Sequence, residues 1–158
     1  MAMDDLREQT EGNELFCKET ARAYSVRLRS LTPYNWALVI GAAVLSTVAG
    51  VGIFADLDFF PKESAAILAL ISGVFTVIHT KANCDYHQAE CKKLKGNFER
   101  LAWEYRNLKS IADTKERRRK LQSLNDRCGL LLENAEAQPS PSNIARAKRL
   151  VRREAQQT

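Results

Sequence analysis

Histidine and cysteine side chains are the groups in this chain best suited to binding a metal, and several of them fall close together. Cys84, His87 and Cys91 follow one another at steps of three and four residues, which places them on one face of a helix, and His79 precedes them. Zinc prefers sulfur and imidazole ligands, but its structural sites use paired ligands held by turns rather than a single helical face. We therefore predict no metal site here.

The motifs that mark enzymes and cofactor sites are also missing from the sequence. There is no glycine-rich phosphate loop, no nucleophile motif and no pair of acidic residues placed where a pocket is expected. Asp56 and Asp58 match only a fragment of a calcium-binding loop. We predict that the protein is not an enzyme and that it has no catalytic residue and no cofactor.

Positive charge is the remaining chemistry of note. Residues 81–158 contain 18 basic and 10 acidic side chains, a net charge of +8. Three interpretations stay open: a solvated face beside anionic lipid, worth about 1 kcal/mol per basic residue, a site for a nucleotide or RNA, or a docking surface for an acidic partner. We predict a regulatory basic surface in two dense runs, which contain Lys115, Arg117, Arg118, Arg119, Lys120, Arg146, Lys148, Arg149, Arg152 and Arg153.

Two long apolar stretches lie in the first half of the chain, before most of the basic residues. Residues 36–54 carry no charge, and residues 64–80 carry none apart from His79. Crossing the hydrocarbon layer takes about 20 apolar residues, with a lower limit near 17. A hairpin buried in a soluble core would keep a polar stripe, and neither stretch has one. We predict a two-span membrane hairpin over residues 34–80, and no signal peptide, because the first apolar stretch starts well inside the chain.

The charges that flank the two spans predict their orientation. Basic residues precede the first span and follow the second, whereas Asp56, Asp58, Glu63 and Lys62 give the loop a net charge of −2. Positively charged flanks stay in the cytoplasm. We therefore expect both termini in the cytoplasm and the loop outside. The cytoplasm is reducing, so we expect free thiols at Cys17, Cys84, Cys91 and Cys128.

Small and hydroxyl residues recur within both spans. Small residues follow four-residue spacing and would let the two backbones approach, or let copies of the chain pack together; they are Ala42, Ser46, Gly50, Ala65, Ala69 and Gly73. Hydroxyl groups at Ser46, Thr47, Ser72 and Thr76 either bond back to their own helix or line a pore formed by several copies. No acid, Lys or Arg lies within a span, which disfavours an ion-coupled carrier, so conduction would need an oligomer.

The polar segments carry heptad patterns. Residues 1–33 predict one amphipathic helix that runs unbroken into the first span, although Pro33 is able to end one helix or open the next; its seam is Cys17, Ala21, Tyr24, Leu28 and Leu31. Residues 81–137 predict a helical hairpin broken at Asp113, with the seam Leu94, Phe98, Leu101, Tyr105, Leu108, Leu121, Leu124, Cys128 and Leu131. Residues 138–158 predict a basic C-terminal helix capped by Ser142. The predicted fold is all-α and oligomeric, with the cytoplasmic helices forming a coiled coil or bundle.

This layout resembles the SLATT superfamily of bacterial conflict-system effectors, which have two transmembrane helices. The most specific stretch is Asn97 to Leu108, where Tyr105, Arg106 and Leu108 match the pattern that follows the second span, and the region around Tyr24 fits as well. The resemblance covers roughly residues 14–135. It implies a pore-forming or membrane-disrupting antiphage effector in the bacterial inner membrane that arrests or kills the infected cell.

The resemblance also implies a trigger, either a sensor protein or a nucleotide signal. The chain shows no nucleotide-binding domain, so we expect activation through a partner or through the basic surface. Two other classes stay open, a membrane-anchored coiled-coil scaffold and a small subunit of a larger membrane complex. An effector should depolarise cells, whereas a scaffold should be silent.

Overall fold

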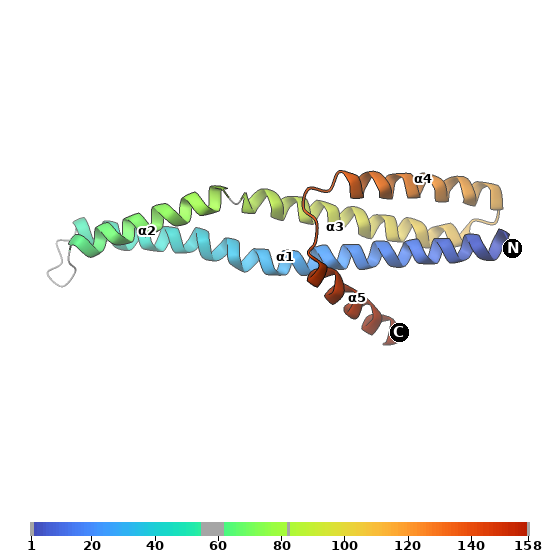
Figure 1. Cartoon of the computed structure of the whole chain (residues 1–158), viewed down its shortest axis with the longest axis horizontal. Coiled ribbons are helices and arrows are strands. Elements are labelled where there is room, and N and C mark those ends of the chain that lie inside the picture. Colours follow the sequence, from blue (N-terminus) through green and yellow to red (C-terminus); the bar gives the residue numbers. More distant parts are fainter. Residues whose placement is uncertain (1, 55–61, 82, 158) are drawn as a thin grey trace. The chain divides into compact units, whose positions relative to one another are not determined.

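The computed structural model describes residues 2–54, 62–81 and 83–157, and these ranges contain helices and no β-strand. The helices are α1 (Ala2–Phe54), α2 (Lys62–Lys81), α3 (Cys84–Asn107), α4 (Thr114–Glu133) and α5 (Pro141–Gln156), with the 3-10 turn η1 (Leu108–Ser110) before α4 (Figure 1). The prediction of an all-helical chain is confirmed. The acidic loop with Asp56 and Asp58 lies outside the described residues, so its predicted location stays a prediction.

Helix α1 keeps one heptad pattern along almost its whole length. Most of its buried side chains are separated by steps of three and four residues or by sums of these steps; they include Leu6, Thr10, Cys17, Ala21, Tyr24, Asn35, Leu38 and Ala49, while the buried Ala23 lies between two of these positions. The predicted N-terminal helix therefore does continue into the first apolar stretch. Pro33 lies inside α1 rather than at a helix boundary, at the cost of the hydrogen bond that its nitrogen cannot donate.

The chain forms two compact units. We call Met1–Leu28 with Ala89–Thr158 the polar unit, and Arg29–Gln88 the hairpin unit. The polar unit contains the first part of α1, most of α3, and η1, α4 and α5. The hairpin unit contains the rest of α1, α2 and the first residues of α3.

The core of the polar unit is built from the predicted heptad seams, which pack against one another within one chain. Tyr24 of α1 stacks on Phe98 of α3, with ring centroids 5.9 Å apart and an angle of 14° between the ring planes. The buried seam residues are Cys17, Ala21, Tyr24, Leu94, Phe98, Leu101, Tyr105, Leu108, Leu121, Leu124 and Cys128, while Leu28 and Leu131 are half-buried. These seams are satisfied internally and do not by themselves require a second copy.

Side-chain caps fix the starts of α4 and α5. Asp113 precedes α4 and accepts a 2.9 Å hydrogen bond from the backbone nitrogen of Lys115, at the predicted break. Ser140 caps α5 and accepts a 3.4 Å bond from the backbone nitrogen of Asn143. The prediction that Ser142 caps this helix was wrong, because Pro141 is well suited to the first helical position and the helix starts earlier.

The hairpin unit presents its apolar side chains outward. Two helical stretches are long and apolar enough to cross a membrane, one within Asp4–Gly52 and one within Glu63–Ser110, and only 17% and 12% of their most apolar windows are buried. The core helix of a soluble protein would be mostly buried. The exposed side chains include Val39, Val44, Val48, Val51, Ile67, Leu70, Val74 and Val77. They need apolar surroundings that the described residues do not supply.

Candidate functional site

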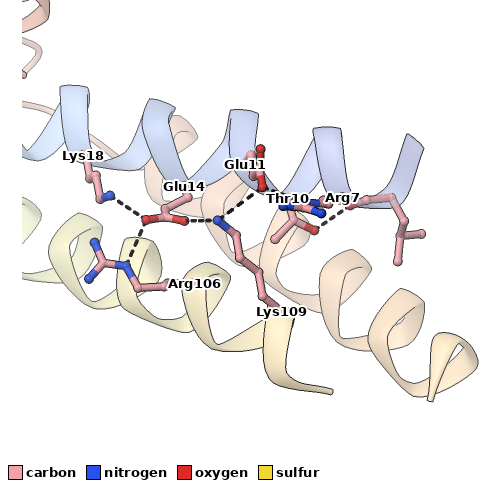
Figure 2. A network of polar contacts seen from close by, with 8 residues as sticks. Arg7, Thr10, Glu11, Glu14, Lys18, Arg106 and Lys109 are labelled. Atoms are coloured by element: carbon pink, nitrogen blue, oxygen red, sulfur yellow. Dashed lines mark hydrogen bonds and ion pairs between the residues drawn. The ribbon is translucent and has the colours of Figure 1, made fainter. Parts of the chain in front are cut away.

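A buried carboxylate joins α1 to the end of α3 in the polar unit (Figure 2). Glu14 of α1 accepts hydrogen bonds from Lys18 Nζ at 2.5 Å, Arg106 Nε at 3.0 Å and Lys109 Nζ at 3.1 Å. Its side chain is only 8% exposed, whereas the three cations reach solvent. Glu14 therefore anchors cations from two helical segments that lie far apart in the sequence.

The charges around Glu14 keep it ionised. Burial disfavours its charged form, but hydrogen bonds from the three cations outweigh burial and lower its pKa to about 2. Beside it, a hydrogen bond from Arg7 and the charge of Lys109 lower the pKa of Glu11. A carboxylate held ionised in this way is poorly suited to donate or accept protons near neutral pH. The cluster is an electrostatic clamp between helices.

A second polar connection holds α3 against α4. Glu104 accepts a 2.5 Å hydrogen bond from Arg127 Nη1, and the Tyr105 hydroxyl lies 2.8 Å from Asn125 Oδ1. Burial disfavours the ionised form of Glu104, but Arg127 and Arg100 together outweigh burial and lower its pKa. Hydrogen bonds and an ion pair therefore join α3 to α4 beside the apolar core of the polar unit.

A separate polar cluster lies at one end of the hairpin unit. Asn35 is buried, and its side-chain amide uses both ends: Oδ1 lies 2.7 Å from His79 Nε2, and Nδ2 donates to Asp85 Oδ1 at 2.7 Å and to Gln88 Oε1 at 3.4 Å. Gln88 Nε2 in turn donates to Thr32 Oγ1 at 2.8 Å. These bonds link α1, α2 and the start of α3 through a connected network.

The predicted small-residue stripes do not form the contact within the hairpin as a set. Ala65 is buried, but Ala69 and Gly73 are exposed on α2. A Cβ added at Gly50 or Gly73 would meet nothing within 4 Å, whereas one at Gly41 would lie 3.3 Å from Phe75 Cε2. Of these three glycines, Gly41 is the one that permits close approach in the hairpin. A role for Gly50 and Gly73 between copies stays a prediction.

The hydroxyl groups of the predicted spans differ in their hydrogen-bond partners. Thr47 Oγ1 donates to the Ala43 carbonyl at 2.8 Å, and Thr76 Oγ1 donates to the Ser72 carbonyl at 3.0 Å. Ser72 differs, because its hydroxyl crosses from α2 to α1. Ser46 is exposed, and Ala42 is half-buried. Two of the four predicted hydroxyl positions thus follow the local alternative.

The two basic runs lie on α4 and α5. Arg117 is half-buried, and its Nε atom donates a 3.0 Å hydrogen bond to the Ile111 carbonyl oxygen. This bond holds the segment before α4 against the first turn of the helix. Lys120 pairs with Glu116 at 2.7 Å. The other members are exposed; they are Lys115, Arg118, Arg119, Arg146, Lys148, Arg149, Arg152 and Arg153. The basic surface is therefore a set of solvated charges with Arg117 as a structural exception.

The side chains considered for zinc have other surroundings. His79 bonds to Asn35, Cys91 is buried, and the side chain of Cys84 lies outside the described residues. Within the described part of the chain, no three His, Cys, Asp or Glu side chains gather to hold a metal ion. Cys17, Cys91 and Cys128 carry free thiols, and burial raises the pKa of Cys91.

Comparison with known proteins adds no relative to this picture. No protein-family model, curated protein or solved structure matches the chain. Functional reasoning therefore starts from the residues described above.

Several residues that organise the two units were not foreseen from the sequence. Glu14 lies three residues before Cys17, at a position of the heptad pattern where an apolar residue is expected. This acidic residue at an apolar position could have marked the site in the sequence. Asn35 breaks the same heptad pattern just before the first apolar stretch. A polar residue at a seam position is costly unless it is bonded, so it marks a site of specific contacts.

Proposed function

We propose that this chain is a membrane-inserted effector of a bacterial defence system. In this proposal the hairpin unit crosses the inner membrane twice, with both termini in the cytoplasm. Copies of the chain assemble and open a pore or disrupt the bilayer when the polar unit receives a signal. The observation that carries the proposal is the outward-facing apolar surface of the hairpin unit. In its two candidate spans, only 17% and 12% of the residues in the apolar window are buried.

The polar groups of the hairpin support insertion into lipid. Hydroxyl groups that face hydrocarbon need hydrogen-bond partners. Thr47, Thr76 and Ser72 all donate to backbone carbonyl oxygens. The Asn35 cluster lies at one end of the hairpin unit, where the second apolar stretch gives way to Lys81. This distribution suits a hairpin with an apolar middle and a polar end.

Effector activity is inferred from the combination of spans with a strongly charged polar unit. The layout resembles the SLATT superfamily, and the sequence contains no recognised catalytic motif. A signal would then act by binding rather than by chemistry. Because one hairpin encloses no path, disruption of the membrane requires several copies. Growth arrest or death of the cell would follow from loss of the membrane potential.

The test is the membrane potential of bacteria that overproduce the chain, together with dye release from vesicles densely loaded with the purified protein. At high local concentration the copies should assemble by mass action without the signal. We expect depolarisation and dye release from the parent and from Ile71→Leu. Ile71→Asp should be inactive, because Ile71 lies near the middle of α2 and is exposed, and an acid near the middle of a span costs about 2.5 to 3.5 kcal/mol on insertion. An unchanged potential in cells and intact vesicles would contradict an effector.

A groove in the polar unit favours a second candidate, the membrane-anchored scaffold. Phe16, Leu132 and Ile144 are each about 40% exposed and line a cavity of about 330 Å³. A soluble partner could seat an apolar side chain there. Under this alternative the hairpin unit is only an anchor, and Phe16→Ser would abolish partner recruitment while the membrane potential stays unchanged throughout.

A further inference from the structure

A second cavity in the polar unit combines positive charge with an exposed aromatic ring. It lies between α1, α3 and α5 and has a volume of about 400 Å³, within the range of small-molecule sites. Lys18 and Arg22 of α1, Lys95, Trp103 and Arg106 of α3, and Glu154 of α5 line it. We call it the Trp103 cleft.

Two of the four cations that line the cleft already pair with a buried carboxylate. Lys18 and Arg106 both bond to Glu14, the clamp of the polar unit. Arg22 pairs with Glu154, whose side chain is 57% exposed. Lys95 pairs with Glu99 at the longer distance of 3.6 Å, and Glu99 is also 57% exposed. Exposed pairs of this kind contribute about 0 to 1 kcal/mol, so an incoming anion can replace them.

Arg22, which lines the cleft, has one unused donor on its guanidinium. Its Nε atom is buried and has no hydrogen-bond partner among the described residues, while one terminal nitrogen donates to Glu154. A guanidinium presents its donors in a planar fork that matches phosphate oxygens. A single carboxylate from α5 therefore leaves part of the Arg22 fork unsatisfied, and a phosphate group has more acceptor oxygens to offer.

Trp103 supplies the aromatic part of the site. Its side chain is 62% exposed at the wall of the same cleft. An indole ring so placed offers a face on which a flat aromatic ring can stack, worth about 1 to 3 kcal/mol for a nucleobase. Cations for a phosphate and a ring for stacking thus meet within one cavity of suitable size.

We propose that the Trp103 cleft binds a phosphate ester that carries an aromatic ring, with the phosphate on Arg22 and Lys95 and the ring on Trp103. Glu154 of α5 is the internal competitor, because it occupies Arg22 when the ligand is absent. Ligand entry therefore removes one of the contacts that hold α5 to α1. This binding does not depend on whether the hairpin unit permeabilises a membrane, and it goes beyond the function proposed above.

The test uses the full chain in detergent micelles, with adenosine 5′-monophosphate, inorganic phosphate and adenosine as probes in isothermal titration calorimetry. We expect the monophosphate to bind more tightly than either part alone. Glu154→Gln should tighten it by up to about fivefold, the size of an exposed ion pair. Arg22→Gln should weaken it at least tenfold. In a Trp36→Phe background, the fluorescence of Trp103 should be quenched on binding.

Arg153→Gln is the matched control, because it removes a charge from the same turn of α5 without lining the cleft. Its affinity should stay within about twofold of the parent. The gain expected from Glu154→Gln cannot arise from misfolding. The proposal is overturned if the parent and Glu154→Gln both show no saturable binding, if Arg22→Gln binds like the parent, or if phosphate alone binds as tightly as the monophosphate.

Discussion

Ser72 of α2 donates a 2.7 Å hydrogen bond to the backbone carbonyl oxygen of Ala42 in α1. Thr47, Thr76 and Thr80, in the same predicted spans, donate instead to carbonyl groups of their own helix. Ser72 is buried, so its bond lies in the contact between the two helices. It ties α1 to α2 at a buried point, and in the proposed membrane hairpin lipid would offer no competing partner there.

Replacing Ser72 with Ala should therefore loosen the hairpin. Hydrogen bonds between membrane helices contribute about 0.6 kcal/mol on average and up to about 1.7 kcal/mol. We expect a loss in this range for Ser72→Ala, measured by titrating the purified protein with sodium dodecyl sulfate. Thr76→Ala removes a hydroxyl that bonds within its own helix and should be milder. Equal losses of stability in the two variants would show that the hydrogen bond between the helices stabilises the hairpin no more than one within a helix.

Gly41 should tolerate bulk poorly. A side chain there meets the ring of Phe75, and overpacking of this kind costs about 1 to 3 kcal/mol. Gly41→Leu should destabilise the hairpin in the same titration, while Gly73→Leu should leave hairpin stability unchanged. If Gly73→Leu instead reduces the particle size by mass photometry, Gly73 packs between copies. Equal tolerance at both positions would contradict the close approach at Gly41.

Acid should weaken the polar unit through Glu14. Its pKa is lowered from an ordinary 4.5 to about 2, so the folded state favours the ionised form. The stabilisation is fully present above pH 4.5 and is lost as the pH falls toward 2, by on the order of 2 to 3 kcal/mol. Thermal melting followed by circular dichroism should show a steeper decline for the parent than for Glu14→Gln.

Glu104 and Glu11 also have lowered pKa values, and both are present in the two proteins. Lys109 pairs with Glu11 as well as with Glu14, so the difference between the two melting profiles measures the loss of the Glu14 carboxylate together with its effect on Glu11. Parallel profiles between pH 5 and pH 2.5 would mean that the three cations do not stabilise the Glu14 carboxylate.

The basic run of α4 should divide into a structural and a regulatory part. Arg117 bonds to the Ile111 carbonyl, so Arg117→Gln should cost about 1 to 2 kcal/mol of stability. Arg118 and Arg119 are exposed, and their joint change to Gln should move stability by less than about 0.5 kcal/mol. If the run receives the signal, the double variant should alter depolarisation in cells. A response like that of the parent would assign the trigger elsewhere.

The helices were predictable because their apolar periods are long and regular. Leu94 to Leu108 and Leu121 to Leu131 follow heptad steps, and the structure has helices at both. Breaks at Asp113 and near Pro139 were visible as local chemistry. The start of α5 was misplaced by two residues because Ser140 and Ser142 are both capable caps, and only the position of Pro141 distinguishes them.

The polar contacts were not predictable because they join helices whose register the sequence does not reveal. Glu14 meets Arg106 across 92 positions of the chain, and nothing local pairs them. Small residues face both sides of a span helix, so spacing alone did not separate Gly41 from Gly73. A heptad seam likewise does not say whether its partner is the same chain or another copy. The prediction of an oligomer therefore no longer draws support from the seams.

Topology is the most direct test of the central proposal that the hairpin crosses the membrane. Asp58→Cys places a thiol in the acidic loop, and Ser142→Cys places one in the first turn of α5. A membrane-impermeant maleimide applied to intact spheroplasts should label Asp58→Cys and should leave both Ser142→Cys and the parent unlabelled until the membrane is opened. The opposite pattern, with Asp58→Cys protected or Ser142→Cys labelled in intact spheroplasts, would contradict a two-span hairpin with cytoplasmic termini.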